Sequence, residues 1–373
     1  MKKWIWLIFL LAAVFFVVGN GGFSQAPQSK IVSAGKSSKN TNTLQAQNAT
    51  NKNQLQHSST PVNNYPQVSE KNLFTHLNKL SFQRYTSPER ERARSYIVSE
   101  LKKLGWEPKL EKFPQGINIF AERQGTEENA GAILIGAHYD TVFRSPGADD
   151  NASGVAVILE IARLLGKTPT PRTLELVFFD KEEAGLLGSL AFSAQPKHIE
   201  NLEGVIVMDM VGYGCYTSGC QKYPDNLPIT PPSDRGDFLA VIGDIEHLPL
   251  LNSFSNERKL IASKSKNSND NSKVSDLKTL RQPSVLKLPI PLKGILTPDV
   301  LRSDHAPFWY QGVGAVLVTD TANLRTPHYH KPSDTVSNIE RSFFRGAAQI
   351  VIDATTDLLE NRKSLKTPVK NNT

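Results

Sequence analysis

The sequence predicts an α/β protein: a three-layer α/β/α domain with a mixed, mostly parallel central sheet. Two observations carry this prediction. Apolar runs of strand length alternate with helical patterns between residues 109 and 360, and such alternation is typical of a sheet flanked by helices. The run "AGAILIGAH" (130–138) is also almost wholly apolar up to its last residue, as expected for a central strand that helices cover on both faces.

The elements follow this pattern in order along the chain. Structure is expected to begin near Ser69, and residues 88–104 carry apolar or small residues at helical spacing up to Gly105. Further helices are expected at 153–166 and 336–360. Polar stretches at 217–236 and 263–283 are expected to be inserted loops. The other expected strands are residues 109–113, 117–122, 173–180, 203–210, 237–244 and 312–320.

The two ends of the chain differ in composition from the middle. After two lysines, residues 4–18 are uninterruptedly apolar, which suits a secretory segment of about 7–15 apolar residues better than a membrane-spanning helix of about 20. We therefore expect a signal peptide or N-terminal membrane anchor (1–22) and an exported protein that is secreted, periplasmic or tethered to the membrane. A disordered Asn/Gln/Ser/Thr-rich linker (23–67) is expected next, then one folded domain (68–361) and a basic disordered tail (362–373).

The formal net charge of +7 arises from the basic residues at these two ends. Residues 1–66 carry six Lys or Arg and residues 362–373 carry four, with no acidic residue in either segment. The folded part between them therefore holds 33 basic and 36 acidic residues. A mildly acidic domain of this kind gives no reason to expect nucleic acid as a partner.

The only two cysteines, Cys215 and Cys220, lie close together in "YGCYTSGCQ". A disulfide between them would be stable outside the cytoplasm and would agree with export. Two free buried thiols are the alternative. A zinc site made of cysteines is not expected from this spacing.

Ionisable residues gather where the expected strands end, which is the edge at which open α/β sheets bind ligands. Unpaired buried carboxylates and imidazoles are costly. Four separate strand ends or loops nevertheless each supply side chains of the kind that zinc prefers, so the pattern predicts a zinc site. The candidate residues are His138, Asp140, Asp149, Asp150, Glu182, Glu183, Asp209, His328 and His330.

The number of candidate ligands predicts two metal ions. Two zinc ions in one site lie about 3.5–4 Å apart, a separation that a shared carboxylate from Asp149 or Asp150 can hold. Of the adjacent Glu182 and Glu183, one can bind metal while the other takes a proton from water. Asp140 follows His138 by two residues, on the same face of an extended strand, where it is suited to orient the imidazole.

Six motifs, in this order, resemble metallopeptidase family 28 (clan MH), which includes secreted bacterial di-zinc aminopeptidases: "GAHYDTV", "PGADDNASG", "DKEEAGLLGS", "VMDMVG", "RSDHAPF" and "HYHKPSDT". The resemblance spans about residues 90–360 and implies a zinc-dependent exopeptidase-like fold. It also implies a role for each matching residue: one zinc on His138 and Asp209, the other on Glu183 and His330, Asp150 as the bridge, Glu182 as the general base, and Asp140 as the residue that orients His138.

The same resemblance favours one residue of each neighbouring pair of candidates and adds further candidate site residues. Counting back from Gly154 favours Asp150 over Asp149 as the bridge, and the "YH" position favours His330 over His328. Tyr329 resembles the phenol that stabilises an oxyanion in some members, although a packing role is the alternative. The segment "RSDHAPF" resembles a substrate-side loop, so its residues are candidates for substrate binding or for local support: Arg302, Asp304 and His305.

We therefore expect an exported aminopeptidase that holds two Zn²⁺ per chain and hydrolyses N-terminal residues of peptides. A glutaminyl cyclase-like acyltransferase is the first alternative, because such relatives use similar ligands with one zinc. A non-catalytic binding ectodomain on the same fold is a second alternative, which the complete ligand set disfavours. The sequence leaves the side-chain preference and the oligomeric state open.

Overall fold

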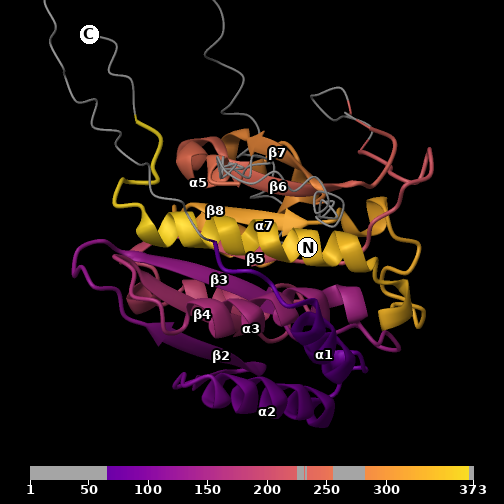
Figure 1. Cartoon of the computed structure of the whole chain (residues 1–373), viewed down its shortest axis with the longest axis horizontal. Helices are drawn as coiled ribbons and strands as arrows, with labels where there is room; N and C mark the ends of the chain where they lie inside the picture. The colour runs from indigo at the N-terminus through magenta and orange to yellow at the C-terminus, as the bar shows by residue number, and fades with distance from the viewer. Residues whose placement is uncertain (1–64, 225–230, 232, 255–281, 369–373) are drawn as a thin grey trace, which may run out of the picture. The chain divides into compact units, whose positions relative to one another are not determined.

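The central sheet of the computed structural model has eight strands in the order β1-β2-β4-β3-β5-β8-β6-β7 (Figure 1). The structure describes residues 65–224, 231, 233–254 and 282–368. The strands are β1 (Lys109–Phe113), β2 (Gly116–Arg123), β3 (Ala132–His138), β4 (Thr173–Phe179), β5 (Leu202–Met208), β6 (Phe238–Asp244), β7 (Ser284–Ile290) and β8 (Ala315–Thr319).

The middle of the sheet is parallel and its margins are mixed. β4, β3, β5 and β8 run parallel to one another. β2 pairs antiparallel with both β1 and β4, while β6 is antiparallel to β8 and parallel to β7. β3 lies between two parallel neighbours and all seven of its residues are buried, which is why its sequence is an apolar run. The predicted mixed sheet is confirmed.

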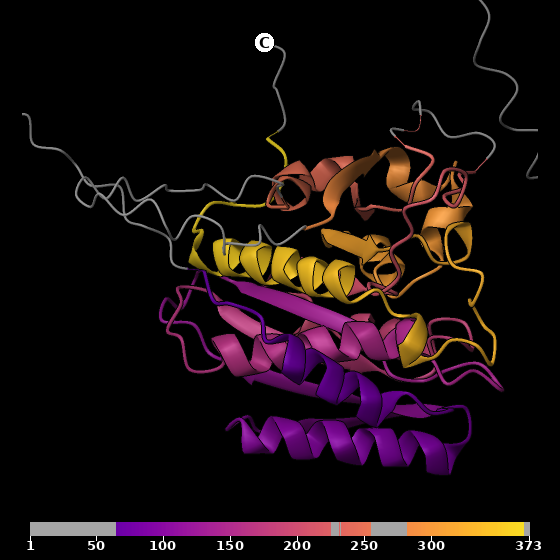
Figure 2. The same ribbon diagram turned by 45° about the vertical axis from the view of Figure 1, so that its right-hand side comes forward.

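Helices cover both faces of the sheet. They are α1 (Glu70–Leu80), α2 (Ser87–Lys103), α3 (Gly154–Leu165), α4 (Leu187–Ser193), α5 (Leu248–Asn252), α6 (Ala306–Tyr310) and α7 (Arg341–Glu360). Ile133 and Ile135 of β3 point into one core cluster with residues of α1, α3 and α7, the helices that lie on one face in Figures 1 and 2. Leu134 points to the other face, into a cluster with Phe192 of α4 and Trp309 of α6. The three-layer arrangement is therefore confirmed.

Two elements differ from the sequence expectation. The closing helix α7 begins at Arg341 rather than at residue 336, because the Glu340 side chain caps it by accepting hydrogen bonds from the backbone N–H groups of Ser342 and Phe343. Residues 336–338 form a separate 3₁₀ turn. β7 was not expected, since its sequence "SVLKLPI" follows a long polar stretch and it lies at the sheet margin.

The described chain extends slightly beyond the expected domain boundaries. Gln349 donates to the carbonyl oxygen of Pro66 at 2.9 Å, so order begins before residue 68. After residue 361, Leu365 is buried in the core, and Thr367 donates its backbone N–H to Glu246 at 2.7 Å. The expected signal or anchor (1–22) and nearly all of the expected linker lie outside the described residues. Within the described ranges, no helix has both the length and the apolar character to cross a membrane.

Candidate metal centre

The candidate ligands meet at the carboxyl ends of three parallel strands. His138 is the last residue of β3, Glu183 follows β4, and Asp209 follows β5. Because β4 and β5 both flank β3 in parallel register, their ends lie at one edge of the sheet. The turn before α3 brings Asp150 to this edge, and the loop after β8 brings His330.

The Asp150 carboxylate lies between two histidines. Its Oδ1 is 3.3 Å from Nε2 of His138, and its Oδ2 is 3.2 Å from Nε2 of His330. Asp209 Oδ1 lies 3.6 Å from the same nitrogen of His138, and Glu183 Oε2 lies 3.1 Å from that of His330. Two groups of three potential ligands result, and Asp150 belongs to both.

The electrostatics of this cluster favour bound positive charge. Burial would lower the pKa of His330, but hydrogen bonds to Asp150 and Glu183 raise it to about 10. At His138, burial is likewise outweighed by the surrounding carboxylates, and the pKa rises well above its usual value. Burial raises the pKa of Glu183 to about 7. The converging carboxylates thus attract positive charge to this position, which a bound metal ion would supply.

The residues present fit a metal ion. Oε1 of Glu183 is buried without a hydrogen-bond partner among the described residues, and such an atom is costly unless something else binds it. Two imidazole nitrogens and three carboxylates, divided into two overlapping groups, form a donor set typical of zinc. Each of these two groups could hold a metal ion, and Asp150 would contribute to both.

The comparison of sequences decides the family. The sequence model of Peptidase family M28 matches residues 118–229 and 252–355, which together make up more than half of the chain. This chain belongs to peptidase family M28. The predicted resemblance and the predicted class of enzyme, a metalloexopeptidase, are confirmed.

Individual relatives agree with this assignment. "Uncharacterized protein YfbL" of Escherichia coli K12 is 33% identical over 244 residues, 62% of this chain and 67% of that protein. "Aminopeptidase YwaD" of Bacillus subtilis is 42% identical over 82 residues, 21% of this chain and only 18% of that protein. The solved structure of an aminopeptidase from Aneurinibacillus sp. strain AM-1 superposes with a TM-score of 0.57 at 17% identity, covering 82% of this chain and 97% of that one, which supports the fold.

In this M28 site, Asp140 lies next to the imidazole of His138 and also contacts the backbone of Glu182 and Glu183. Its Oδ1 lies 3.4 Å from Nδ1 of His138, the imidazole that Asp140 is predicted to orient. The same carboxylate accepts the backbone N–H groups of Glu182 at 3.1 Å and Glu183 at 3.3 Å. Asp140 therefore fixes the turn that carries both glutamates relative to His138.

Glu182 lies beside the ligands without joining either group. Its Oε2 is 4.0 Å from Nε2 of His138, and its side chain is almost completely buried. Burial raises its pKa well above the usual value, and the nearby carboxylates of Asp209 and Asp304 raise it further against the opposing effect of His138. A glutamate in this position can accept a proton.

Tyr329 lies over the ligand His330, with ring centroids 3.7 Å apart. Its phenol oxygen accepts a hydrogen bond from Arg302 at 3.1 Å. Burial raises the pKa of Tyr329, and the nearby carboxylates of Asp150 and Asp209 act in the same direction. The phenol stays protonated, so its O–H can donate to a group in the site.

The structure separates the neighbouring alternatives. Asp149 accepts the backbone N–H of Gly212 at 2.8 Å and belongs to neither ligand group. Nδ1 of His328 lies 3.0 Å from the hydroxyl oxygen of Ser333, away from the ligand groups. Asp150 and His330 are therefore the better ligands in this geometry.

The substrate-side candidates divide into one exposed and two buried residues. Arg302 is exposed, whereas Asp304 and His305 have no solvent-accessible surface. Ser189 donates a short hydrogen bond to Asp304, and His305 packs edge-on against Trp309 at 4.6 Å. Because both side chains are buried at the start of α6, local support is favoured over substrate contact for Asp304 and His305. Asp304 lies close enough to raise the pKa of Glu182.

Sequence reasoning missed a carboxylate that holds the bridging turn. Asp334 accepts the backbone N–H of Asp149 at 2.9 Å and that of Asp150 at 3.1 Å. Its position in the motif "HYHKPSDT" was a usable signal. The disulfide candidates Cys215 and Cys220 are bonded in the structure and contribute no ligand to this site.

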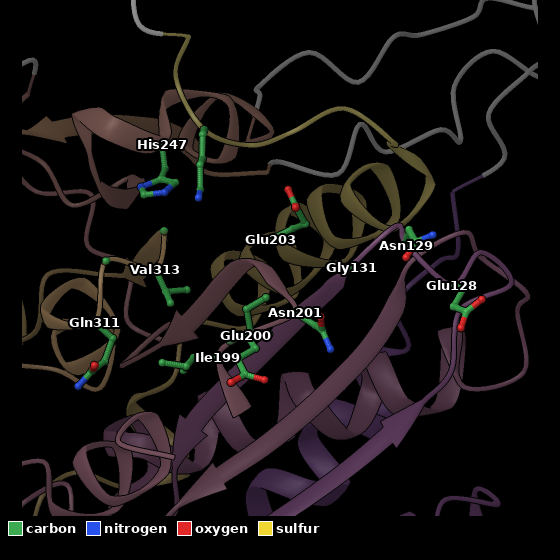
Figure 3. Close-up of a pocket in the computed structure, with 14 residues that line it drawn as sticks. Glu128, Asn129, Gly131, Ile199, Glu200, Asn201, Glu203, His247, Gln311 and Val313 are labelled. Atoms are coloured by element: carbon green, nitrogen blue, oxygen red, sulfur yellow. The ribbon is translucent and has the colours of Figure 1, made fainter. Parts of the chain in front are cut away.

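A cavity of about 430 Å³ lies at the opposite, amino edge of the sheet (Figure 3). Gly131, Leu202 and Gly314 line it, and these residues lie at or next to the starts of β3, β5 and β8. None of the candidate metal ligands is among its lining residues. The hollow is therefore separate from the M28 site.

Proposed function

We propose that this protein is an exported aminopeptidase that holds two zinc ions per chain and removes N-terminal residues from peptides. The observation that carries the proposal is the Asp150 carboxylate, whose two oxygens face different histidines at 3.3 and 3.2 Å. Zinc supplies Lewis acidity, which polarises a peptide carbonyl and makes water a stronger nucleophile. The chain's own residues supply the proton transfers and the binding.

Glu182 is the proposed general base. It lies next to the ligands but in neither ligand group, and its raised pKa allows it to take a proton from the attacking water and pass it to the leaving amine. The Asp140 carboxylate holds the Glu182 backbone at 3.1 Å. The proton carrier is therefore kept in a fixed position relative to His138.

Tyr329 is the proposed donor to the developing oxyanion. Arg302 occupies a lone pair of the phenol oxygen, so the O–H bond is free to point at the scissile carbonyl. A donor that is already in place stabilises the transition state without reorganisation. The exposed Arg302 is also proposed to line the substrate entrance.

The surplus of carboxylates supports an aminopeptidase. The free α-amine of a peptide is cationic and fits a site rich in acidic groups, whereas a C-terminal carboxylate would be repelled. Several relatives, YwaD among them, are also named aminopeptidases. The matched segment covers less than a fifth of YwaD, so its substrates are not transferred to this chain.

Export is proposed from the apolar segment near the N-terminus and from the disulfide. The apolar segment 4–18 resembles a secretory or anchoring segment, and the disulfide of Cys215 and Cys220 suits an oxidising compartment. Residues 1–22 are proposed as signal or anchor, residues 23–67 as the linker, and the zinc peptidase domain follows. Fractionating cells and sequencing the N-terminus of the mature protein tests this: a cytoplasmic protein with an intact N-terminus would contradict it.

The function is tested with zinc-loaded protein and aminoacyl anilides that carry leucine, alanine or glutamate. We expect release of the anilide from unblocked substrates, no release from N-acetylated ones, and loss of activity on chelation. A protein that binds one zinc and converts N-terminal glutamine to pyroglutamate would instead be the cyclase-like enzyme. A protein that binds no metal and hydrolyses nothing would be a binding domain.

A further inference from the structure

Arg84 is a buried arginine in the connection between α1 and α2. Its side chain is almost inaccessible, with 1% of the residue exposed. It lies before residue 118, where the match to the M28 family model begins. A buried guanidinium is costly unless its donors are satisfied, so its partners indicate what it does.

All of its side-chain hydrogen bonds go to backbone carbonyl oxygens. Nε donates to Tyr139 at 2.7 Å, between His138 and Asp140. The two terminal nitrogens donate to Pro146 at 2.8 Å, Gly147 at 2.9 Å and Asp150 at 3.5 Å. The remaining bonds reach Leu80 and Phe82 in its own connection. One planar fork thus joins the end of β3 to the turn that carries the bridging Asp150.

The turn is built around this side chain. Gly147 has a φ of +61°, and a Cβ there would lie 2.6 Å from a terminal nitrogen of Arg84. The backbone N–H of Arg84 also donates to the hydroxyl of Thr141 at 2.9 Å. Arg84 therefore fills the space beneath the turn, and no larger residue at 147 would leave room for it.

We propose that Arg84 is a positioning residue for the metal centre: it fixes the backbone of the Asp150 turn relative to His138 and so raises the affinity for zinc. This inference rests on the proposed zinc site. The positive charge itself would repel zinc, and it is offset by nearby carboxylates such as Asp334, Asp150 and Asp140. The benefit comes from the placement of carbonyl groups, which a lysine cannot reproduce because it lacks the planar fork.

Arg172 provides a matched control at the amino edge of the sheet. It is equally buried, and it donates to the carbonyl oxygens of Ala130 at 2.9 Å, Leu358 at 3.2 Å and Lys363 at 2.6 Å. None of these acceptors adjoins a candidate ligand. Replacing either arginine costs fold stability, but only Arg84 is connected to the metal centre.

The first experiment measures zinc affinity by competition with a chromophoric chelator for the wild type, Arg84→Lys and Arg172→Lys. We expect Arg84→Lys to weaken zinc binding by about 10- to 100-fold, as for residues that support metal ligands. Arg172→Lys should stay within about threefold of the wild type. Unchanged affinity in Arg84→Lys, or an equal loss in Arg172→Lys, would overturn the proposal.

A second measurement needs no variant and so remains informative if Arg84→Lys does not fold. By linkage, zinc and the Arg84 contacts must stabilise each other. Hydrogen exchange of the wild-type chain should therefore slow in residues 80–86 and 145–152 when zinc is added, with no change around residues 170–174. No slowing at 80–86 while two zinc ions bind would contradict the proposal.

The two proposals fail in different ways. Suppose that the wild type binds zinc, that Arg84→Lys binds it more weakly, and that the wild type hydrolyses no peptide. This result would contradict the proposed function but support the role of Arg84. An active wild type with unchanged zinc affinity in Arg84→Lys would keep the function and remove this inference.

Discussion

The two edges of the central sheet use similar residues in different ways. Each edge holds a buried arginine on backbone carbonyls, Arg84 at the carboxyl edge and Arg172 at the amino edge. Each also holds a histidine next to carboxylates. At the amino edge, Nδ1 of His247 lies 2.8 Å from Oδ1 of Asp244, and Lys293 lies 3.1 Å from Glu246, so each of these two carboxylates has a nitrogen partner within the protein.

At the carboxyl edge the carboxylates outnumber such partners. Asp150, Glu183 and Asp209 converge on two imidazoles, and these carboxylates raise the pKa of both histidines. A cavity of about 430 Å³ nevertheless lies at the amino edge. An excess of converging ligand atoms therefore distinguishes the candidate metal site, which a cavity or a group of acidic residues does not.

The largest difference in zinc binding and activity is expected between Asp150→Asn at the carboxyl edge and its control, Asp244→Asn, at the amino edge. Asp150→Asn removes the shared carboxylate, so we expect loss of bound zinc and a fall in activity well beyond the roughly 10- to 100-fold cost of losing a supporting residue. Asp244→Asn should bind zinc normally and lose about 1 kcal/mol of unfolding free energy. Zinc analysis and denaturant titration measure both, and equal zinc content in the two variants would break the comparison.

Glu182→Gln and Glu203→Gln test which edge performs the chemistry. The first removes the proposed base but keeps its backbone bond to Asp140, so kcat should fall by about 10²- to 10⁴-fold with unchanged zinc content. Glu203 lines the amino-edge cavity, and its replacement should leave kcat and KM within about twofold. Steady-state kinetics with zinc-loaded protein measures both. Full activity in Glu182→Gln would assign the proton transfer to another group.

Asp334→Asn sharpens the comparison within the carboxyl edge. The Asp334 carboxylate accepts hydrogen bonds from the backbone N–H groups of Asp149 and Asp150. In Asp334→Asn, the amide nitrogen would face one of these two donors and could not accept its hydrogen bond. We expect zinc affinity to fall by about 10- to 100-fold while the circular dichroism of the metal-free protein stays unchanged. Unaltered zinc affinity would show that the Asp149–Asp150 turn keeps its conformation without the Asp334 carboxylate.

The smallest effect is expected from Glu175, which belongs to neither edge. Burial, with help from Glu122 and Glu111, raises its pKa to about 7. The folded state therefore keeps a proton that the unfolded state releases near pH 4.5, and stability is lost as the pH rises from about 4.5 to 7. Glu175→Gln should match the wild type at pH 4 and gain about 1–2 kcal/mol at pH 8, a value reduced for partial exposure. Thermal melts at both pH values check this, and zinc content should not change.

Much of the fold and of the candidate site could be predicted, because both follow from local patterns. Apolar runs mark the strands, and candidate ligand residues lie at or shortly after the ends of β3, β4 and β5. The ligand residues come together because these strands are parallel neighbours. The buried places of Asp304 and His305 could not be read from the motif "RSDHAPF", since they depend on how α6 packs against the sheet.

The supporting residues were harder to predict because their partners are distant in sequence. Arg84 reaches Asp150 across 66 positions, and Asp334 reaches Asp149 across 185. No periodicity connects such pairs. β7 was not predicted for a related reason: it lies at the margin of the sheet, pairs with one neighbour, and most of its residues are exposed or only partly buried.

The most direct test of the account is the amount of zinc bound by the purified chain after loading and desalting. The bridging position of Asp150 predicts two zinc ions per chain, falling on the Asp150→Asn substitution and unaffected by Asp244→Asn. One zinc ion per chain, or none, in the wild type would contradict the central claim of a bridged pair at the carboxyl edge.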